Sequence, residues 1–519
     1  FSNNQLGLSY QLKYAEGQGD SRNFFENFFD INYFFDNGLY LFSQIEYSSP
    51  PLVGVQSNNI SDAVNIFYLQ YSGLNYDFTL GNLYLLYGRG LSMHTYQDQG
   101  IDYDNSLFGV ESVFNIQDKL DVSIALGTNN FESRINPADT IPTLYIENDL
   151  ISINSELYFD NLNFHYLAMV YNQQYDYEDI LEMMSLSSDL GDYLYSRKEY
   201  IIDSGENPSD EMKNVEHNIG MDFNLRRFDF YFEKSIIYYD KLLSGREEGF
   251  RDYVSTYFNL NDFNIFYEYK NYYTPYFYSL FSNPPICFRE SSSVLLSRNL
   301  HSIDFNNEYG HQFEINRTFK NSLNFIFSYA FAFKHDKNLS EPSLFDTFKY
   351  LFSNDGLYLS YSDFYPFKQT YFELNGWVLN ELLYYKIGYD SYYEVTNLKT
   401  IKAKTIPMQF AYNFKKGNSA TFYLEFQEKI EERSNSNHEY FYFSPSYNHF
   451  GEWLLTVFID KEDSKSPWSG IDFTYNINNS SQISLFYGSQ KGGLVCANGS
   501  CVIQPDFEDG FKVSYLISI

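Results

Sequence analysis

Positive charge, cysteine and long apolar runs are all scarce in this sequence. Its 519 residues hold 35 Lys and Arg against 67 Asp and Glu, which gives a formal net charge of −32. This balance excludes nucleic acid as a partner, because neutralising phosphate groups requires clustered positive charge. No stretch of about 18 uncharged apolar residues occurs, so no transmembrane helix is expected anywhere.

Motifs that announce catalytic or metal chemistry are also missing. The eight histidines are scattered singly, without an HExxH motif or Cys/His pairs at zinc spacing, and GxSxG and glycine-rich phosphate loops are absent. A site assembled from distant strands would leave no such motif. We nevertheless expect no enzyme, no catalytic residue, no cofactor and no declared metal site.

Aromatic side chains, in contrast, are abundant, with 52 Tyr, 51 Phe and 3 Trp. In many segments large apolar residues occupy every second position, as at the odd positions from Leu323 to Phe333. A period of two gives a β-strand one apolar face and one milder face. The same alternation closes the chain, from Phe511 to Ile519. The sequence therefore predicts an all-β protein.

Connections of two lengths alternate along the chain. Short turn signals such as 117–119 and 160–161 are followed by long connections such as 88–105 and 274–300. Outer-membrane β-barrels have this pattern, with short periplasmic turns and long extracellular loops. We count about 25 candidate strands and, because single-chain bacterial barrels have even strand numbers, expect about 24, within a range of roughly 20 to 26. We predict one large transmembrane antiparallel β-barrel over residues 1–519.

A soluble propeller or a row of sandwiches is the competing interpretation. The sequence shows no repeat of about 40 to 50 residues, which a propeller would have. Several alternating runs, such as 221–239, are also longer than the usual soluble strand of about five or six residues. Both observations favour the membrane barrel.

The barrel prediction implies a bacterial outer-membrane location, and hence export with a signal peptide that is cleaved before Phe1. Because strand patterns begin at about Leu6, we expect no separate N-terminal plug domain. The longest insertion, 176–214, contains apolar spacing for a short helix at 179–186. It is either a surface loop with its own small core or a lid or docking element.

Gly88, Arg89 and Gly90 form the most specific local feature. A strand pattern runs directly into two glycines that flank one arginine. The glycines allow a sharp turn that presents the guanidinium. The charge either points into the lumen, where it pairs with an acidic residue of another strand, or lies exposed at a rim bulge.

Asp98, Asp102 and Asp104 follow shortly afterwards. Their carboxylates are close enough in sequence to suggest a hard cation such as structural calcium. Their spacing is not that of an EF-hand loop, so a solvated acidic turn is the alternative.

Two of the three cysteines, Cys496 and Cys501, flank a short loop that contains glycine. A disulfide between them would hold this loop tightly and imply an oxidising compartment. Two unpaired thiols remain the alternative. Cys287 is left over, and a buried, unreactive thiol is expected there.

Two stretches resemble a known family. The segment from Gly81 to Gly109, GNLYLLYGRGLSMHTYQDQGIDYDNSLFG, and the ending with Gly492-Gly493, Cys496, Cys501 and the strand from Phe507 are similar to a domain-of-unknown-function family of outer-membrane barrels from Bacteroidota-type bacteria. The resemblance implies one outer-membrane barrel without an assigned activity. The final residue, Ile519, departs from the aromatic ending that is common in outer-membrane barrels.

A barrel of this width would leave an aqueous hole unless something fills it, because barrels of about 16 to 18 strands are already open channels. The loop after Tyr87 and the insertion 176–214 are the candidates within the chain, and a lipoprotein or periplasmic subunit is the candidate outside it. We predict a porin-like channel for passive or gated passage, in contact with outer-membrane lipid. The alternative is an accessory or scaffold subunit of an outer-membrane secretion or assembly complex.

Overall fold

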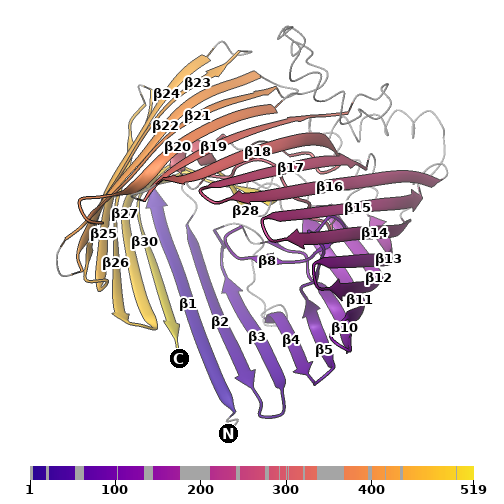
Figure 1. The fold of residues 1–519 in the computed structure, drawn as a ribbon. Coiled ribbons are helices and arrows are strands. Elements are labelled where there is room, and N and C mark those ends of the chain that lie inside the picture. Colours follow the sequence, from indigo (N-terminus) through magenta and orange to yellow (C-terminus); the bar gives the residue numbers. More distant parts are fainter. Residues whose placement is uncertain are drawn as a thin grey trace, which may run out of the picture.

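The computed structural model describes residues 4–18, 23–52, 64–101, 103–133, 144–175, 211–240, 246–274, 280–291, 293–299, 301, 303–319, 322–335, 367–395, 400–414, 417–432, 436–463, 465–497 and 500–519. Twenty-four strands form one closed antiparallel sheet in which β1 pairs with both β2 and β30 (Figure 1). This confirms the predicted fold class and strand number.

The barrel strands follow the chain order around the ring. The first half consists of β1 (Gln5–Gln18), β2 (Phe24–Phe34), β3 (Leu39–Ser48), β4 (Val64–Ser72), β5 (Tyr76–Leu83), β10 (Leu107–Ile116), β11 (Leu120–Ser133), β12 (Leu144–Phe159), β13 (Leu162–Tyr175), β14 (Glu211–Leu225), β15 (Phe228–Asp240) and β16 (Arg246–Leu260). The second half consists of β17 (Phe263–Tyr273), β18 (Asn307–Phe319), β19 (Leu323–Phe333), β20 (Phe367–Val378), β21 (Leu383–Val395), β22 (Thr400–Asn413), β23 (Ser419–Glu431), β24 (Ser436–His449), β25 (Trp453–Glu462), β26 (Trp468–Asn478), β27 (Ser481–Gln490) and β30 (Phe507–Ser518).

The remaining elements lie outside the barrel sheet. They are β6 (Leu86–Tyr87), β7 (Met93–His94), β8 (Gln97–Asp98), β9 (Tyr103–Asp104), the short helix α3 (Val294–Ser297), β28 (Gly493–Ala497) and β29 (Ser500–Gln504). No helix in the described part of the chain is long and apolar enough to cross a membrane.

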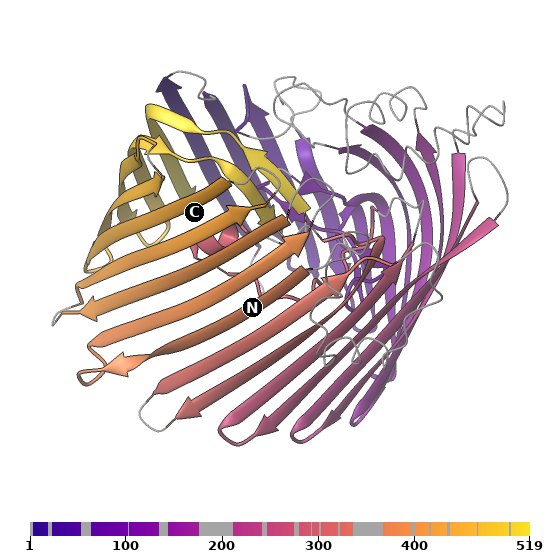
Figure 2. The same cartoon turned by 90° about the horizontal axis from the view of Figure 1, so that it is seen from above.

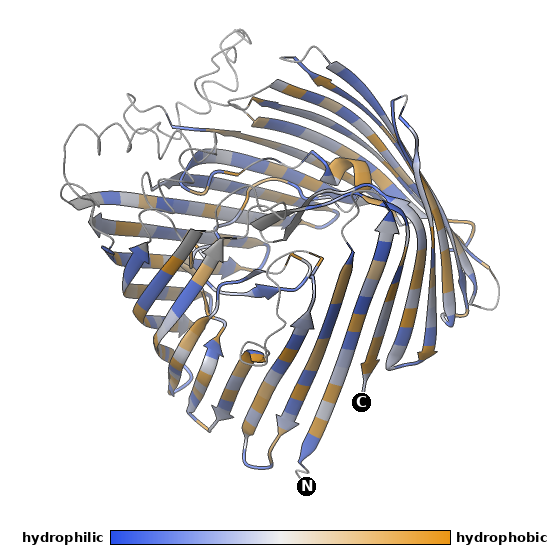
Figure 3. Ribbon diagram, turned by 180° about the vertical axis from the view of Figure 1, so that it is seen from behind, coloured by the Kyte–Doolittle hydropathy of each residue, from blue (hydrophilic) through white to orange (hydrophobic). Residues whose placement is uncertain are grey.

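The period of two in the sequence becomes two faces of the barrel wall. Along β14, Asn214, Glu216 and Asn218 are buried, whereas Ile219 is 53% exposed. Exposed apolar side chains recur around the outer face, and hydropathy alternates along the strands (Figure 3). The polar face of these strands points into the barrel and the apolar face points outward.

The two rims differ as expected. Short turns such as Gln117–Lys119, between β10 and β11, lie at the rim that also holds both described chain ends (Figure 1). The long connections lie at the opposite rim. Strand β14 begins at Glu211, so 211–214 belong to the barrel and not to the predicted insertion 176–214, which was drawn too long. Residues 176–210, with the predicted helix at 179–186, lie outside the described residues.

Glycine allows neighbouring strands to approach closely where the wall bends. Gly109 on β10 lies opposite Gly81 on β5 and Gly127 on β11. A Cβ atom on Gly109 would come within 2.0 Å of the Leu126 carbonyl oxygen. No larger residue fits at this corner of the ring.

Candidate functional site

Two segments from the long-loop rim fold into the ring of strands (Figures 1 and 3). The first inward segment comprises residues 84–101 and 103–106, between β5 and β10. The second inward segment comprises residues 280–291, 293–299, 301, 303 and 304, ahead of β18. They define the candidate functional site, because a barrel of 24 strands is wide enough to pass solutes unless its lumen is filled.

The first inward segment consists of two small hairpins. β6 pairs with β7, and β8 pairs with β9. Thr95 fixes the turn between them: its Oγ1 accepts a hydrogen bond from the Leu85 N–H at 2.6 Å and donates one to the Leu83 carbonyl at 3.0 Å. The segment therefore has its own hydrogen-bonded structure inside the lumen.

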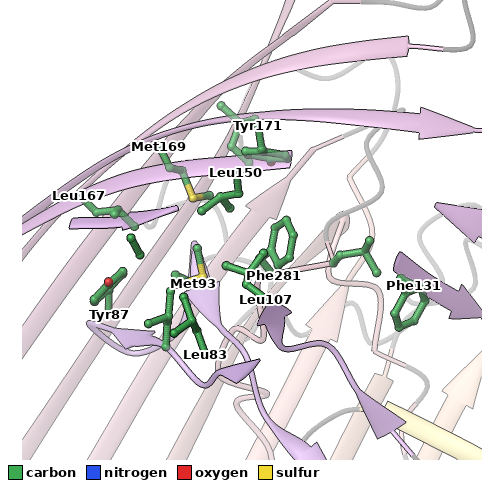
Figure 4. Packing of buried hydrophobic residues seen from close by; sticks show 14 of the residues in the cluster. Leu83, Tyr87, Met93, Leu107, Phe131, Leu150, Leu167, Met169, Tyr171 and Phe281 are labelled. Carbon is green, nitrogen blue, oxygen red and sulfur yellow. The ribbon is translucent and has the colours of Figure 1, made fainter. Parts of the chain in front are cut away.

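An apolar patch of the inner wall receives this segment. Met93 is fully buried, and Tyr87 nearly so, in a cluster with side chains of the wall strands β10–β15, where β10 contributes Leu107 (Figure 4). The wall contributes Ala125, Phe131, Ile146, Leu150, Leu167, Met169, Tyr171, Met212, Ile237 and Tyr239. Each large buried apolar side chain contributes about 1.5–3 kcal/mol relative to its exposed state. The first inward segment is thus held mainly by the hydrophobic effect.

Gly88, Arg89 and Gly90 lie against the inner face of β15. The Arg89 N–H donates to Glu233 Oε2 at 2.7 Å, and the Arg89 guanidinium lies 4.8 Å from the centre of the Tyr231 ring. Gly88 has a φ of +60°, and a Cβ atom there would come within 2.7 Å of Glu233 Oε1. Only glycine fits between the turn and this carboxylate.

Arg89 is exposed, and among the described residues its guanidinium forms no salt bridge. The acidic residue from another strand is present, but it binds the backbone of Arg89 and not its charge. Within the described part of the chain, the guanidinium contacts the Tyr231 ring and no carboxylate.

A fully buried ion pair lies beneath the same segment. Arg251 Nη1 is 3.5 Å from Glu216 Oε1 and donates to the Leu91 carbonyl at 2.9 Å. Asn218 reaches Ser92 Oγ at 2.8 Å. The bonds to Leu91 and Ser92 thus position the first inward segment on the wall, in addition to its burial in the apolar patch.

The acidic turn is only partly described. Asp98 Oδ1 accepts the Gly100 N–H and Asp104 Oδ1 accepts the Ser106 N–H, both at 2.7 Å. Asp102 lies outside the described residues. Calcium at Asp98, Asp102 and Asp104 therefore stays a prediction.

The second inward segment begins against the first. The His94 N–H donates to the Phe281 carbonyl at 2.5 Å, and the Asn283 N–H donates to the Gly90 carbonyl at 2.9 Å. Asn105 Nδ2 donates to the Leu280 carbonyl at 2.8 Å. From this seam the chain continues across the lumen to β23 and β25.

The rest of this segment is held by an apolar cluster around Phe288 and by charged side chains of the wall. Glu425 on β23 accepts three hydrogen bonds from the start of α3, from Ser293 Oγ at 2.7 Å and from the N–H groups of Val294 and Leu295 at 3.0 and 2.7 Å. Gln427, two residues further along β23, donates to the Leu295 carbonyl at 2.9 Å. One strand thus holds both the start and the middle of the short helix.

Arg298, just after α3, pairs with Asp460 on β25. Arg298 Nη1 lies 3.1 Å from Asp460 Oδ1, and Nη2 donates to Oδ2. The Arg298 side chain is 21% exposed, whereas that of Asp460 is 4% exposed. This is a two-point guanidinium–carboxylate pair with one side open to solvent.

His301 completes the set of charged contacts. Its Nδ1 lies 2.6 Å from Glu394 and its Nε2 lies 3.0 Å from Glu308, which also pairs with Lys270. Burial alone lowers the pKa of the His301 imidazole, but the two carboxylates outweigh burial, and the pKa lies above its ordinary value. His301 is therefore held most firmly in its protonated form.

The three cysteines have different surroundings. Cys287 is buried in a small cluster with Leu91, Tyr231 and Tyr253, and burial raises the pKa of its thiol well above the ordinary value. Cys496 and Cys501 are paired directly opposite each other in the β28–β29 ladder. That register brings their backbones together, and the disulfide itself stays a prediction.

His438, Glu462 and Asp463 form a group in which one ligand atom from each residue lies within 4.8 Å of the others. His438 Nδ1 is 2.7 Å from Asp463 Oδ2, and Glu462 is paired with Lys465 and Lys491. Two lysines already neutralise Glu462, which makes this group a poor site for a metal ion.

Carboxylates dominate the buried charged residues. The described residues include eleven buried carboxylates but only Arg251 and Lys270 as buried Lys or Arg. The carboxylates are Glu26, Glu46, Glu216, Glu233, Glu308, Glu373, Asp390, Glu394, Glu425, Asp460 and Glu462. Glu26, Glu216, Glu308, Asp460 and Glu462 are paired with Lys or Arg. The carboxylates in excess of these pairs make the interior more favourable to cations than to anions.

The loop after Tyr87 was predicted as a candidate to fill the lumen, whereas the second inward segment was predicted only as a long connection, 274–300. Apolar residues in a loop would have been the signal: Ile286, Cys287 and Phe288 follow two prolines, and Val294 to Leu296 form another apolar run. In a long surface loop such runs would be exposed to water. They indicate a loop that packs inward.

The family described as "Family of unknown function (DUF6029)" matches residues 9–519. No curated protein matches the chain.

Among solved structures, the siderophore receptor PirA from Pseudomonas aeruginosa has a TM-score of 0.50 at 9% identity, over 99% of this chain and 80% of the receptor. PirA from Acinetobacter baumannii has a TM-score of 0.49 at 9% identity, over 100% of this chain and 81% of that one. The P pilus usher PapC translocation pore has a TM-score of 0.41 at 9% identity, over 99% of both chains. The likeness to the Pseudomonas receptor shows a shared barrel fold and carries nothing about substrate.

Proposed function

The chain belongs to the DUF6029 family, whose function is unknown, and we propose that its barrel spans a bacterial outer membrane as a gated channel that prefers cations. The outer face supports the membrane location. Ile124, Leu126, Ile151 and Ile153, on the neighbouring strands β11 and β12, are all at least 38% exposed. Such an apolar outer surface suits lipid, as in other transmembrane barrels.

The orientation follows from the rims. Short turns and both ends of the described chain lie at one rim (Figure 1). In outer-membrane barrels this rim faces the periplasm and the long loops face outward. The two inward segments would then guard the lumen from the outer side. Export with a cleaved signal peptide and an origin in Bacteroidota-type bacteria are part of the same proposal.

One observation carries the channel proposal: carboxylates outnumber Lys and Arg among the buried residues, and segments of the chain itself occupy the lumen. Seen from above, both inward segments lie within the ring of strands (Figure 2). A scaffold subunit has no need of an acidic interior. A channel uses such charges to select ions, and inward loops to restrict passage.

Single-channel recording on the purified full-length barrel in planar bilayers tests this proposal. We expect brief openings whose reversal potential, in a potassium chloride gradient, indicates a preference for cations. A variant in which residues 285–304 are replaced by a glycine–serine linker should open for longer and conduct several times more current. The control keeps the segment and replaces the exposed Glu428 on the outer face by Gln.

The accessory or scaffold role predicts the opposite outcome. Under that role neither the native barrel nor the linker variant conducts, and extraction from native membranes in mild detergent yields a stable complex with lipoprotein or periplasmic subunits. Silence of both proteins in the bilayer would therefore rule out the channel.

A further inference from the structure

Asp460 lies on a preformed part of the wall, whereas Arg298 lies on a segment outside the barrel sheet. β25 is hydrogen-bonded on both sides, to β24 and β26. The second inward segment has one helical element in its described part, the four residues of α3. The carboxylate therefore stays in place if its guanidinium partner leaves.

The surroundings of Arg298 favour exchange over permanent attachment. Its side chain is 21% exposed, so that water in the lumen reaches one side of the pair. Its neighbour Asn299 is 8% exposed, and neither the Nδ2 nor the Oδ1 of its amide has a hydrogen-bond partner among the described residues. A buried amide without partners penalises the docked arrangement.

Loss of Arg298 would leave the nearly buried Asp460 carboxylate without its cation. That is unfavourable unless another cation replaces it. A solute with a guanidinium group offers the same planar pair of donors. Exchange of one guanidinium for another keeps the pair intact, and it would free the second inward segment from one of its wall contacts.

We propose that Asp460 is a binding site for the guanidinium group of a cationic solute, and that Arg298 occupies this site as an internal ligand when the lumen is closed. The inference rests on the proposed channel function and names its substrate class. The excess of buried carboxylates in the described residues supports it, because such an interior concentrates cations.

Calorimetric titration of the purified full-length barrel in detergent tests the site without any need for conductance. The probe is argininamide, and its control is citrullinamide, which keeps the α-amino group but has an uncharged urea in place of the guanidinium. We expect argininamide to bind and citrullinamide not to bind. Asp460→Asn should weaken argininamide binding at least about tenfold, and Arg298→Gln should strengthen it by about tenfold, because the internal competitor is gone.

The opposite responses of the two variants distinguish a competing ligand from a merely structural ion pair. If the pair were only structural, both substitutions would leave argininamide binding unchanged or weaken it, and the proposal would be wrong. Arg298→Lys provides a second competitor test, since an ammonium cannot form the two-point pair. Its affinity for argininamide should lie between those of the native protein and Arg298→Gln.

Lys402→Gln is the matched control. It removes the cation of the exposed pair with Glu432 and should leave argininamide binding unchanged. Argininamide binding without conductance would reject the channel and keep the site. Conductance without argininamide binding would reject the site and keep the channel.

Discussion

The two inward segments are attached to the same barrel by different physics. The first places Leu85, Tyr87 and Met93 in an apolar patch of β11–β15. The second packs Phe288 against a smaller apolar cluster of β19–β22, and it also depends on Glu425, Asp460 and the carboxylates around His301. Hydrophobic contacts respond little to pH and to moderate salt, whereas hydrogen bonds to ionised groups respond to salt, pH and charged solutes. We therefore expect conditions that weaken ionic contacts to release the second segment before the first.

The reactivity of Cys287 can report release of the second segment. It is buried at the contact between the two segments, next to Leu91 of the first. The rate at which N-ethylmaleimide modifies its thiol reports how often the second segment leaves the wall, because a buried thiol reacts only after local opening.

The largest effect is expected at the apolar contact. Met93→Ala should destabilise the docked first segment by about 2–5 kcal/mol, because it leaves a cavity in a fully buried site. Amide hydrogen exchange over residues 84–106 measures this change, which should be the same at low and high salt. Leu86→Ala, at a position that is 56% exposed, is the control. A strong salt dependence of the Met93→Ala effect would contradict the hydrophobic assignment.

The next effect concerns Glu425. Glu425→Gln replaces the acceptor of three hydrogen bonds by a neutral amide and should cost about 1.5–3 kcal/mol. Labelling of Cys287 should become about ten to a hundred times faster, while exchange over the first inward segment stays unchanged. Glu428→Gln on the outer face of β23 serves as the control. If Glu425→Gln loosened both segments equally, the two attachments would not be separate.

A smaller effect follows from the raised pKa of His301. Protonated His301 contributes to attachment of the second segment, and this contribution is fully present below about pH 6.5, the ordinary histidine value. It is lost as the pH rises through the raised pKa of the docked state. Channel opening and Cys287 labelling should therefore increase severalfold on the alkaline side. The labelling rate is first corrected for thiol ionisation, which itself increases with pH.

His301→Gln should remove this pH dependence. The variant is to be compared with His94→Gln, a histidine of the first inward segment whose pKa is lowered by burial. A pH profile that persists in His301→Gln would assign the dependence to another group.

The smallest effect is expected at the exposed pair between Lys402 and Glu432. Lys402→Gln should change the free energy of unfolding by less than about 1 kcal/mol, because exposed ion pairs contribute little. Urea unfolding in lipid vesicles measures it. A large loss there would show that charge pairing in general, and not burial of the carboxylates in the lumen, stabilises this protein.

The sequence predicted the barrel well because the signal is local. Alternation along β14 or β19 can be recognised within a single strand, and turns such as Gln117–Lys119 are marked by their own residues. Strand number and the difference between the rims follow from counting such signals. Alternation does not mark the residue at which a loop ends and a strand begins. The predicted insertion 176–214 is therefore four residues too long, because β14 begins at Glu211.

The candidate site was predictable only in part. Two glycines around Arg89 indicate a sharp turn, but they do not indicate that Glu233, 144 residues away, would bind its backbone. The apolar inner patch is only weakly indicated by the sequence, in runs such as Leu167 to Tyr171 that are apolar at nearly every position. A strand that is apolar on both faces is buried on both, and here the second contact is the inward segment.

The sequence by itself determined the barrel and the apolar character of its outer face, since each depends on residues two positions apart, and it limited the strand number to about 24. Only the tertiary structure decided what occupies the lumen. Glu425 is about 130 residues from the helix that it holds, and Asp460 is 162 residues from Arg298. Closure of the sheet brings such residues together. A local sequence pattern cannot indicate which carboxylate in the interior will accept a hydrogen bond from which donor.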